Sequence, residues 1–162
     1  MGDALEANFR KAMRTLASAV TIVSTANDNR RFGMTATAVC SLTMQPPTLL
    51  VCVNQSTNLH HPLLSAGRFC INILHADQDE LARTFGRKGI EDRFAYGNWQ
   101  LDDRGVPSLS THRRVCSVPW RTATAIEHIP SWSAPFIGRG CATAFIRCFT
   151  KTDDIPSASP KA

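Results

Sequence analysis

Small and polar residues gather at the ends of two adjoining predicted strands in the segment GMTATAVCSLTMQPPTLLVCVNQST, residues 33–57. The first cluster consists of Thr35, Ala36 and Thr37. Its small side chains leave backbone N–H and C=O groups accessible to a ligand. The second cluster consists of Asn54, Ser56 and Thr57. It supplies hydroxyl and amide donors, which can bind a phosphate. Together the clusters suit a flat ligand that has a polar edge and carries a phosphate.

The same residues also allow a purely structural interpretation, which spacing alone favours. Ser, Thr and Asn cap helix starts and fill strand ends, and a short helix is predicted over residues 58–66. Pro62 would lie in the first turn of that helix, where its missing N–H costs little. Gly67 would end it.

Strands dominate the elements that must position these residues. β-Branched residues predict a strand over residues 19–25, and Asn27-Asp28-Asn29 is a turn signal before a returning strand over 31–39. The run over 48–54 is almost continuously apolar, which predicts a central strand buried on both faces. A further strand is predicted over 68–75.

Two amphipathic helices flank these strands. The first, over residues 4–17, has an apolar stripe made of Leu5, Phe9, Met13 and Leu16. The second, over 77–85, turns Leu81 and Phe85 inward. Because the helices are short, a mainly β fold is predicted: a β-barrel with short peripheral helices rather than a doubly wound sheet.

Composition narrows the class of protein. The 162 residues are 43% hydrophobic and 19% charged, which fits one globular domain. No apolar run is long enough to span a membrane, and no secretion signal precedes the first helix. The six cysteines include no CxxC pair. We therefore expect a reduced, cytoplasmic protein. The adjacent His60 and His61 would not face one metal. The net charge of the chain is +5, and residues 110–162 contribute +4 of it. No cluster of basic residues alternates with aromatic residues, so nucleic-acid binding is not favoured.

Several segments, taken in order, resemble the flavin reductase family. They are FRKAMRTLASAVTIVST, the segment over residues 33–57, GRFCINIL, ELARTFGRKG and DRFAYGNW, within residues 9–109. The resemblance implies an FMN-binding split barrel that forms a homodimer. It also implies NADH- or NADPH-dependent reduction of FMN or FAD, with the reduced flavin delivered to a separate monooxygenase.

The resemblance also assigns the cofactor-binding residues. The isoalloxazine ring would lie against Thr35, Ala36, Thr37 and Ala38. The ribityl-phosphate arm would be held by Asn54, Gln55, Ser56 and Thr57. The outer part of the site would be formed by Phe85, Gly86 and Arg87. Hydride transfer between two stacked rings requires close positioning and no strong acid or base, so no catalytic side chain is expected.

After Leu109 the resemblance ends, which divides the chain into a split-barrel core over 1–109 and a segment over 110–162 that is divergent or frameshifted and partly disordered. Pro119, Pro130 and Pro135 are expected to interrupt strand pairing in this segment. Possible codons for residues 126–135, read two bases later, can spell the Arg-Thr-His-containing motif that the family has here. We hypothesise a frameshift, with a genuinely divergent C-terminus as the alternative. Either would leave unpaired strand edges in the barrel.

Two other functions stay open at this stage. One is a non-catalytic flavin-binding or inactive relic of the same fold. The other is a different split-barrel activity, resembling pyridoxamine-phosphate oxidases or haem-binding relatives. The sequence does not distinguish FMN from FAD or NADH from NADPH.

Overall fold

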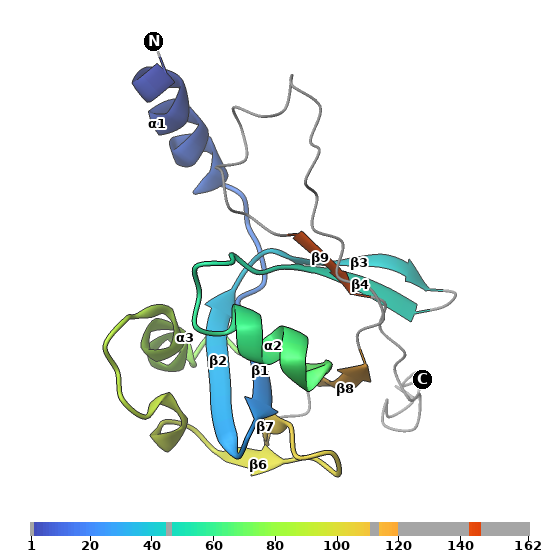
Figure 1. The fold of residues 1–162 in the computed structure, drawn as a ribbon. Helices are drawn as coiled ribbons and strands as arrows, with labels where there is room; N and C mark the ends of the chain where they lie inside the picture. The colour runs from blue at the N-terminus through green and yellow to red at the C-terminus, as the bar shows by residue number, and fades with distance from the viewer. Residues whose placement is uncertain (1, 45–46, 111–113, 120–142, 147–162) are drawn as a thin grey trace, which may run out of the picture.

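The computed structural model describes residues 2–44, 47–110, 114–119 and 143–146 (Figure 1). Its helices are α1 (Gly2–Met13), α2 (His60–Ala66), α3 (Asp79–Gly86) and the 3-10 helix η1 (Arg93–Ala95). Its strands are β1 (Thr21–Asn27), β2 (Arg30–Ala36), β3 (Val39–Met44), β4 (Pro47–Cys52), β5 (Arg68–Ile73), β6 (Trp99–Leu101), β7 (Pro107–Leu109), β8 (Arg114–Pro119) and β9 (Thr143–Ile146).

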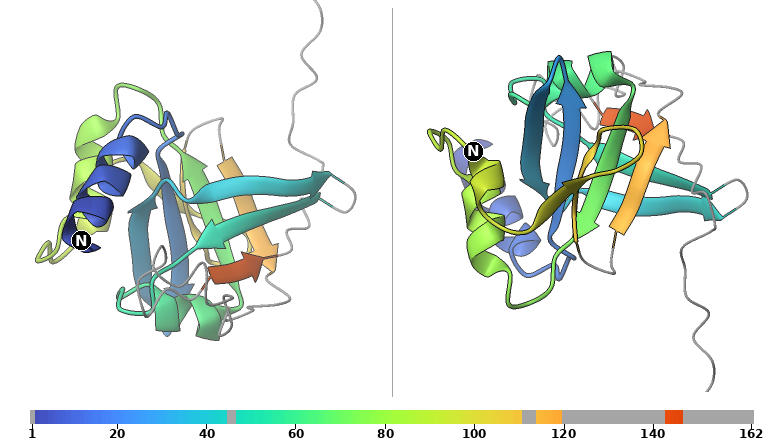
Figure 2. Two further views of the ribbon diagram at one scale, coloured as in Figure 1. Left: turned by 90° about the horizontal axis from the view of Figure 1, so that it is seen from above. Right: turned by 90° about the horizontal axis from the view of Figure 1, so that it is seen from below.

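The described strands form three antiparallel sheets, in the orders β2-β1-β5-β8, β3-β4-β9 and β6-β7. The β3–β4 pair reaches out beyond the first sheet, while α3 lies against the β2 side of that sheet (Figure 2). The mainly β architecture with short helices is therefore as predicted. No helix in the described ranges is both long and apolar enough to cross a membrane.

A two-residue turn sets the register of the β1–β2 hairpin. Asp28 and Asn29 have φ angles of 49° and 59°, the left-handed conformation that a type I′ turn requires. The flanking Asn27–Arg30 pair exchanges hydrogen bonds, and bonded pairs then alternate along the strands. By this alternation, residues 31, 33 and 35 turn their backbone N–H and C=O groups away from β1. They point to the edge of β2 that no other described strand pairs with.

Two apolar clusters pack on opposite faces of the β1–β2–β5 sheet, because successive strand residues point to opposite sides. The larger cluster contains Val23, Ala36, Val51, Val53, Leu59, Leu63, Phe69 and Ile71. The smaller, beneath α3 and η1, contains Ile22, Leu81, Phe85, Phe94 and Leu109. The predicted inward orientation of Leu81 and Phe85 is confirmed.

A buried asparagine joins three strands. The Nδ2 of Asn72 on β5 donates to the carbonyl of Ile22 (3.0 Å) and to the Ser24 hydroxyl (2.9 Å) on β1. Its Oδ1 accepts from the Leu109 N–H on β7 (2.8 Å). The Ser24 hydroxyl in turn donates to the Pro107 carbonyl (2.6 Å). These bonds satisfy the polar atoms that this part of the core buries.

Some predicted elements differ from the structure. The helix over 4–17 is observed at Gly2–Met13, and its apolar stripe is 42% to 63% exposed. The strand predicted to be buried on both faces lies between β3 and β9, but Leu49, Leu50 and Cys52 are only half-buried because this pair extends away from the main sheet.

The C-terminal prolines were expected to interrupt strand pairing, and Pro119 is the last residue of β8, although it still pairs. Pro119 ends β8 opposite Arg68, and β8 is the outermost strand of its sheet, where a missing N–H is tolerated. Pro130, Pro135 and the ending KTDDIPSASPKA lie outside the described residues.

Candidate functional site

The predicted ring-binding residues lie at the end of β2 and just beyond it. The Thr35 hydroxyl donates to the Ala82 carbonyl of α3 (2.6 Å), so this side chain holds the helix against the strand. The Ala36 side chain is buried in the larger cluster, whereas Thr37 and Ala38 are exposed. What this segment offers a ligand is therefore backbone groups beside small side chains.

The predicted arm-binding residues form a turn that is held together internally. The Asn54 Oδ1 accepts from the Ser56 N–H (2.9 Å) and the Ser56 hydroxyl (3.0 Å), and the Thr57 hydroxyl donates to the Asn54 carbonyl (2.7 Å). This is an Asx turn. Helix α2 begins later, at His60, and its N-cap residue Leu59 makes no side-chain cap. The capping interpretation of Asn54, Ser56 and Thr57 is therefore wrong.

A backbone hydrogen bond brings the predicted ring-binding segment 35–38 and the predicted arm-binding segment 54–57 together. The Cys52 N–H donates to the Ala38 carbonyl (3.0 Å), and the Asx turn starts two residues after Cys52. Thr37 and Ala38 thus lie beside the start of the segment 54–57, whose Asn54, Gln55 and Ser56 are exposed.

The third predicted group lies at the C-terminal end of α3. Gly86 is next to Thr35, since a Cβ on Gly86 would lie 3.9 Å from the Thr35 Cβ. Gly86 and Arg87 are exposed, but Phe85 is 2% exposed, and its ring contacts those of Phe94 and Trp99. Phe85 is therefore a core residue that positions its neighbours.

Arg93 links two of these groups and was not predicted. Its guanidinium donates to the Gly33 carbonyl (3.2 Å) and to the Arg87 carbonyl, so it ties the edge of β2 to the end of α3. Its Nε is buried and has no hydrogen-bond partner in the described part of the chain. No local sequence pattern marks it, because Gly33 lies 60 positions away.

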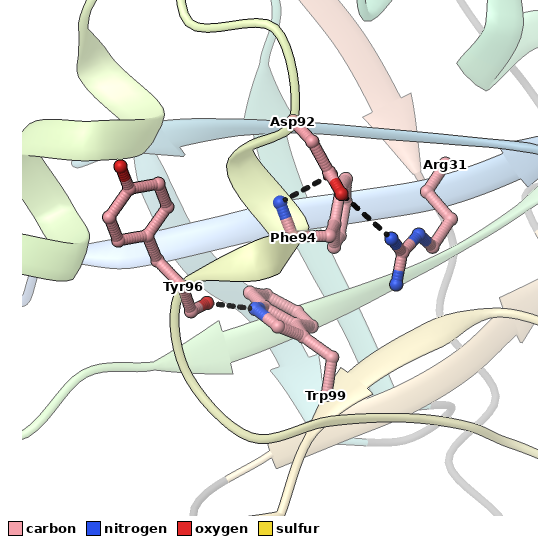
Figure 3. Close-up of polar contacts among 5 residues, drawn as sticks. All are labelled: Arg31, Asp92, Phe94, Tyr96 and Trp99. Atoms are coloured by element: carbon pink, nitrogen blue, oxygen red, sulfur yellow. Dashed lines mark hydrogen bonds and ion pairs between the residues drawn. The ribbon is translucent and has the colours of Figure 1, made fainter.

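A cleft of about 540 Å³ opens beside Arg93, between residues 30–33 of β2, residues 58–59 and the loop 89–94. Figure 3 shows part of its wall: Arg31 pairs with Asp92 (3.5 Å), while the other carboxylate oxygen of Asp92 accepts the Phe94 N–H (3.0 Å). The Arg31 guanidinium also lies 4.9 Å from the centre of the Phe94 ring. The same loop is fixed further on, where the Trp99 indole donates to the Tyr96 carbonyl (2.7 Å).

The adjacent histidines at the start of α2 pack edge to face, with ring centroids 5.4 Å apart. Burial and, to a smaller extent, the charge of His61 lower the pKa of His60. The described residues contain no group of three potential metal ligands. The site has the chemistry of a binding edge: backbone donors and acceptors, small side chains and an adjoining arginine-lined cleft.

Known proteins of similar sequence and of similar structure point to one family. The family model "Flavin reductase like domain" matches residues 13–117. The NADH-dependent FMN reductase RutF of Pseudomonas syringae pv. syringae is 44% identical over 104 residues, which are 64% of this chain and 58% of the relative. The reductase component of the FADH(2)-dependent resorcinol hydroxylase of Rhizobium sp. is 43% identical over 126 residues, covering 72% of this chain and 70% of the relative.

The chain thus spans less than two thirds of the RutF relative's length. Among solved structures, nitrilotriacetate monooxygenase component B from Mycobacterium thermoresistibile superposes with a TM-score of 0.78 at 21% identity, covering 99% of this chain and 82% of that one. At this identity the likeness shows the fold, and the predicted split-barrel fold is confirmed.

Proposed function

Because the chain belongs to the flavin reductase-like domain family, we propose that it reduces FMN or FAD with NADH or NADPH and supplies the reduced flavin to a partner monooxygenase. The two relatives support both halves of this proposal, since one is an NADH-dependent FMN reductase and the other a reductase component of a hydroxylase.

The observation that carries the proposal is the edge of β2. Residues 33 and 35 turn backbone groups to this edge, the small residues 36–38 continue it, and the Cys52–Ala38 bond places the segment 54–57 alongside. A flat heterocycle with donors and acceptors along one side fits such an edge, and a phosphate fits the exposed amide and hydroxyl groups of the segment 54–57. The residues present therefore suit a flavin.

We assign the isoalloxazine to residues 35–38 through their backbone, with the Thr35 hydroxyl retained by α3. Asn54, Gln55, Ser56 and Thr57 take the ribityl-phosphate arm, and Gly86 and Arg87 border it. When bound, the flavin supplies the hydride-accepting chemistry. The chain holds the ring in place and leaves one face open to the nicotinamide, so orientation is its main contribution to the rate.

The proposal extends to the assembly and the chain's C-terminal part. The resemblance to the family implies a homodimer, and the cysteine pattern favours a cytoplasmic location. The family match ends at residue 117, eight residues past the predicted boundary at 109, which supports a departure from the family sequence in the residues that follow. We keep the frameshift as the proposed cause.

The direct test is oxidation of NADH and NADPH by the purified 162-residue protein, with FMN, with FAD and with neither. We expect flavin-dependent oxidation well above the protein-free rate. The variant S56A should weaken flavin binding roughly tenfold, because it removes a hydroxyl that can turn from Asn54 to donate to the phosphate. S65A, an exposed serine in α2, is the matched control.

Two results would oppose the proposal. A folded protein that binds flavin without oxidising either nicotinamide would be the non-catalytic relic. A protein whose absorption spectrum reveals pyridoxal phosphate or haem would belong to another split-barrel activity.

A further inference from the structure

The guanidinium of Arg93 joins two backbone carbonyl groups that border the proposed flavin site. Its Nη1 donates to the Gly33 carbonyl on β2 (3.2 Å), and its Nη2 donates to the Arg87 carbonyl just past α3. Within the described part of the chain, no carboxylate lies at ion-pair distance from it. A planar guanidinium with several donors holds two acceptors at once in a fixed geometry. Arg93 therefore acts as a rigid link between these two carbonyls.

The Arg93 side chain is held inward at a cost. Its Nε is buried and has no hydrogen-bond partner among the described residues, and an unpaired buried donor is unfavourable. The next residue, Phe94, is 8% exposed, and its ring packs edge to face on that of Phe85. The packing of Phe94 and the two carbonyl bonds together keep Arg93 in this position. An unsatisfied buried group of this kind calls for a functional explanation.

The first of the two carbonyls lies on the open edge of β2. Residues 33 and 35 both turn their backbone N–H and C=O groups to this edge, with which no other described strand pairs. Along such an edge the donors and acceptors repeat every two residues, so a flat ligand could also bind two residues earlier. Because Arg93 occupies the Gly33 carbonyl, that alternative is closed. The available stretch then begins at Thr35.

The second carbonyl fixes the end of α3 against the same edge. The Thr35 hydroxyl donates to the Ala82 carbonyl (2.6 Å), and a Cβ on Gly86 would lie 3.9 Å from the Thr35 Cβ. The carbonyl that Arg93 binds belongs to Arg87, the residue after Gly86. Helix α3 is thus attached to β2 on both sides of Gly86, once through the Thr35 hydroxyl and once through Arg93.

We propose that Arg93 is a positioning residue for the flavin. It sets the register in which the isoalloxazine meets the edge of β2, and it fixes residues 86–87 as the border of the ring site. It acts through the Gly33 and Arg87 carbonyls. The inference rests on the proposed function and adds to it a residue that lies outside all three segments assigned to the cofactor.

The first test measures binding of FMN and of FAD to the full chain by quenching of flavin fluorescence. We expect R93A to weaken binding of both flavins roughly tenfold, because two charge-assisted hydrogen bonds are lost. The visible circular dichroism of the bound flavin should also change, because the ring no longer has a single register. R83A is the matched control, since Arg83 is an exposed arginine on α3 that pairs with Asp79. It should alter neither measurement.

A second test separates positioning from a loss of stability. Ethylguanidinium added to R93A should restore much of the flavin affinity and the native dichroism, because it can occupy the space of the missing guanidinium. S24A removes a bond elsewhere in the core, from the Ser24 hydroxyl to the Pro107 carbonyl (2.6 Å). It should lower the melting temperature and leave the dichroism of the bound flavin unchanged.

The variant R93Q serves if R93A does not fold, because it keeps an amide donor for one of the two carbonyls. Equal flavin affinity and equal dichroism in the native protein and a folded Arg93 variant would overturn the proposal. So would a weakening that ethylguanidinium does not reverse and that S24A reproduces, since Arg93 would then be merely structural.

These outcomes differ from a failure of the proposed function. A native protein that binds flavin and oxidises no nicotinamide would refute the reductase activity, and the binding measurements would still decide the role of Arg93. A folded native protein that binds no flavin would overturn both.

Discussion

At the scale of single residues, Gly33 shows how closely β2 and α3 approach each other. A Cβ at this position would lie 2.7 Å from Cε1 of Phe85 and 3.2 Å from Cζ of Phe94. Glycine is a weak strand former, so its presence here reflects the packing of these rings against the backbone. The carbonyl of the same residue accepts from Arg93, which makes Gly33 a meeting point of the strand, the helix and the cleft.

We predict that G33A lowers the free energy of unfolding by about 1–3 kcal/mol, because Phe85 and Phe94 must move to admit the methyl group. Urea denaturation measures the effect. G86A is the control: its Cβ would meet Thr35 at an ordinary 3.9 Å, so it should change stability much less. Equal stability of G33A and the native protein would show that the rings adjust without cost.

At the scale of elements, the short strand β7 is held to the core by side-chain bonds as well as by β6. We predict that N72L frees this strand, since it removes the side-chain oxygen that accepts from the Leu109 N–H. Losing a hydrogen bond in the core typically costs about 0.5–1.5 kcal/mol. Hydrogen exchange should accelerate at Leu109 in particular.

The exposed Asn98 provides the comparison for this substitution. N98L should leave the exchange rate of the Leu109 amide unchanged. Protection of Leu109 in N72L equal to that in the native protein would mean that the β6–β7 pairing alone holds the strand.

Helix α2 should give the protein a pH-dependent stability. The pKa of His60 is lowered from its ordinary value of 6.5, chiefly by burial, so the unfolded chain binds the proton more tightly than the folded one. The contribution of neutral His60 to stability is then fully present above pH 6.5 and is lost as the pH falls through 6.5 towards the folded-state pKa. Thermal unfolding should show a smaller drop over this range for H60Q than for the native protein.

The two causes of the shift can be separated with H61Q. Since burial is the larger cause, H61Q should keep most of the native drop in melting temperature. Parallel pH profiles for the native protein and H60Q would rule out a contribution from His60.

Local signals in the sequence predicted much of the fold. Asn27-Asp28-Asn29 marked the hairpin turn, and Gly67 ends α2 with a φ of 66°. These features depend on residues a few positions apart. The role of Asn72 could not be read in this way, because its bonds reach Leu109, 37 positions along the chain.

The candidate site likewise has parts that local sequence signals predicted and parts that they did not. The segments 35–38 and 54–57 were predicted, and the structure places them side by side. The cleft was missed because its arginines come from β2 and from a loop about 60 residues later. Likewise, the sequence showed polar residues at 54–57, but a helix cap and an Asx turn require the same residue types, so only the backbone geometry distinguishes them.

At the scale of the whole molecule, we predict that resequencing the gene will find a single inserted or deleted base after the codon for residue 109. The chain read in the restored frame should bury more surface and so unfold in urea with a larger m-value than the 162-residue chain. If no single-base shift restores the family motif, the C-terminal segment is native to this protein and the frameshift is wrong.

The tight turn at Asp28 and Asn29 has a consequence for the order of folding. Its seven cross-strand pairs join residues 3 to 15 positions apart, whereas β1 meets β5 across 46 to 52 positions. Closing short loops is fast and loses little entropy, so we expect the β1–β2 hairpin to form early and β5 to dock on it later. The strand edge that faces the ligand would then be among the first parts of the chain to acquire its native shape.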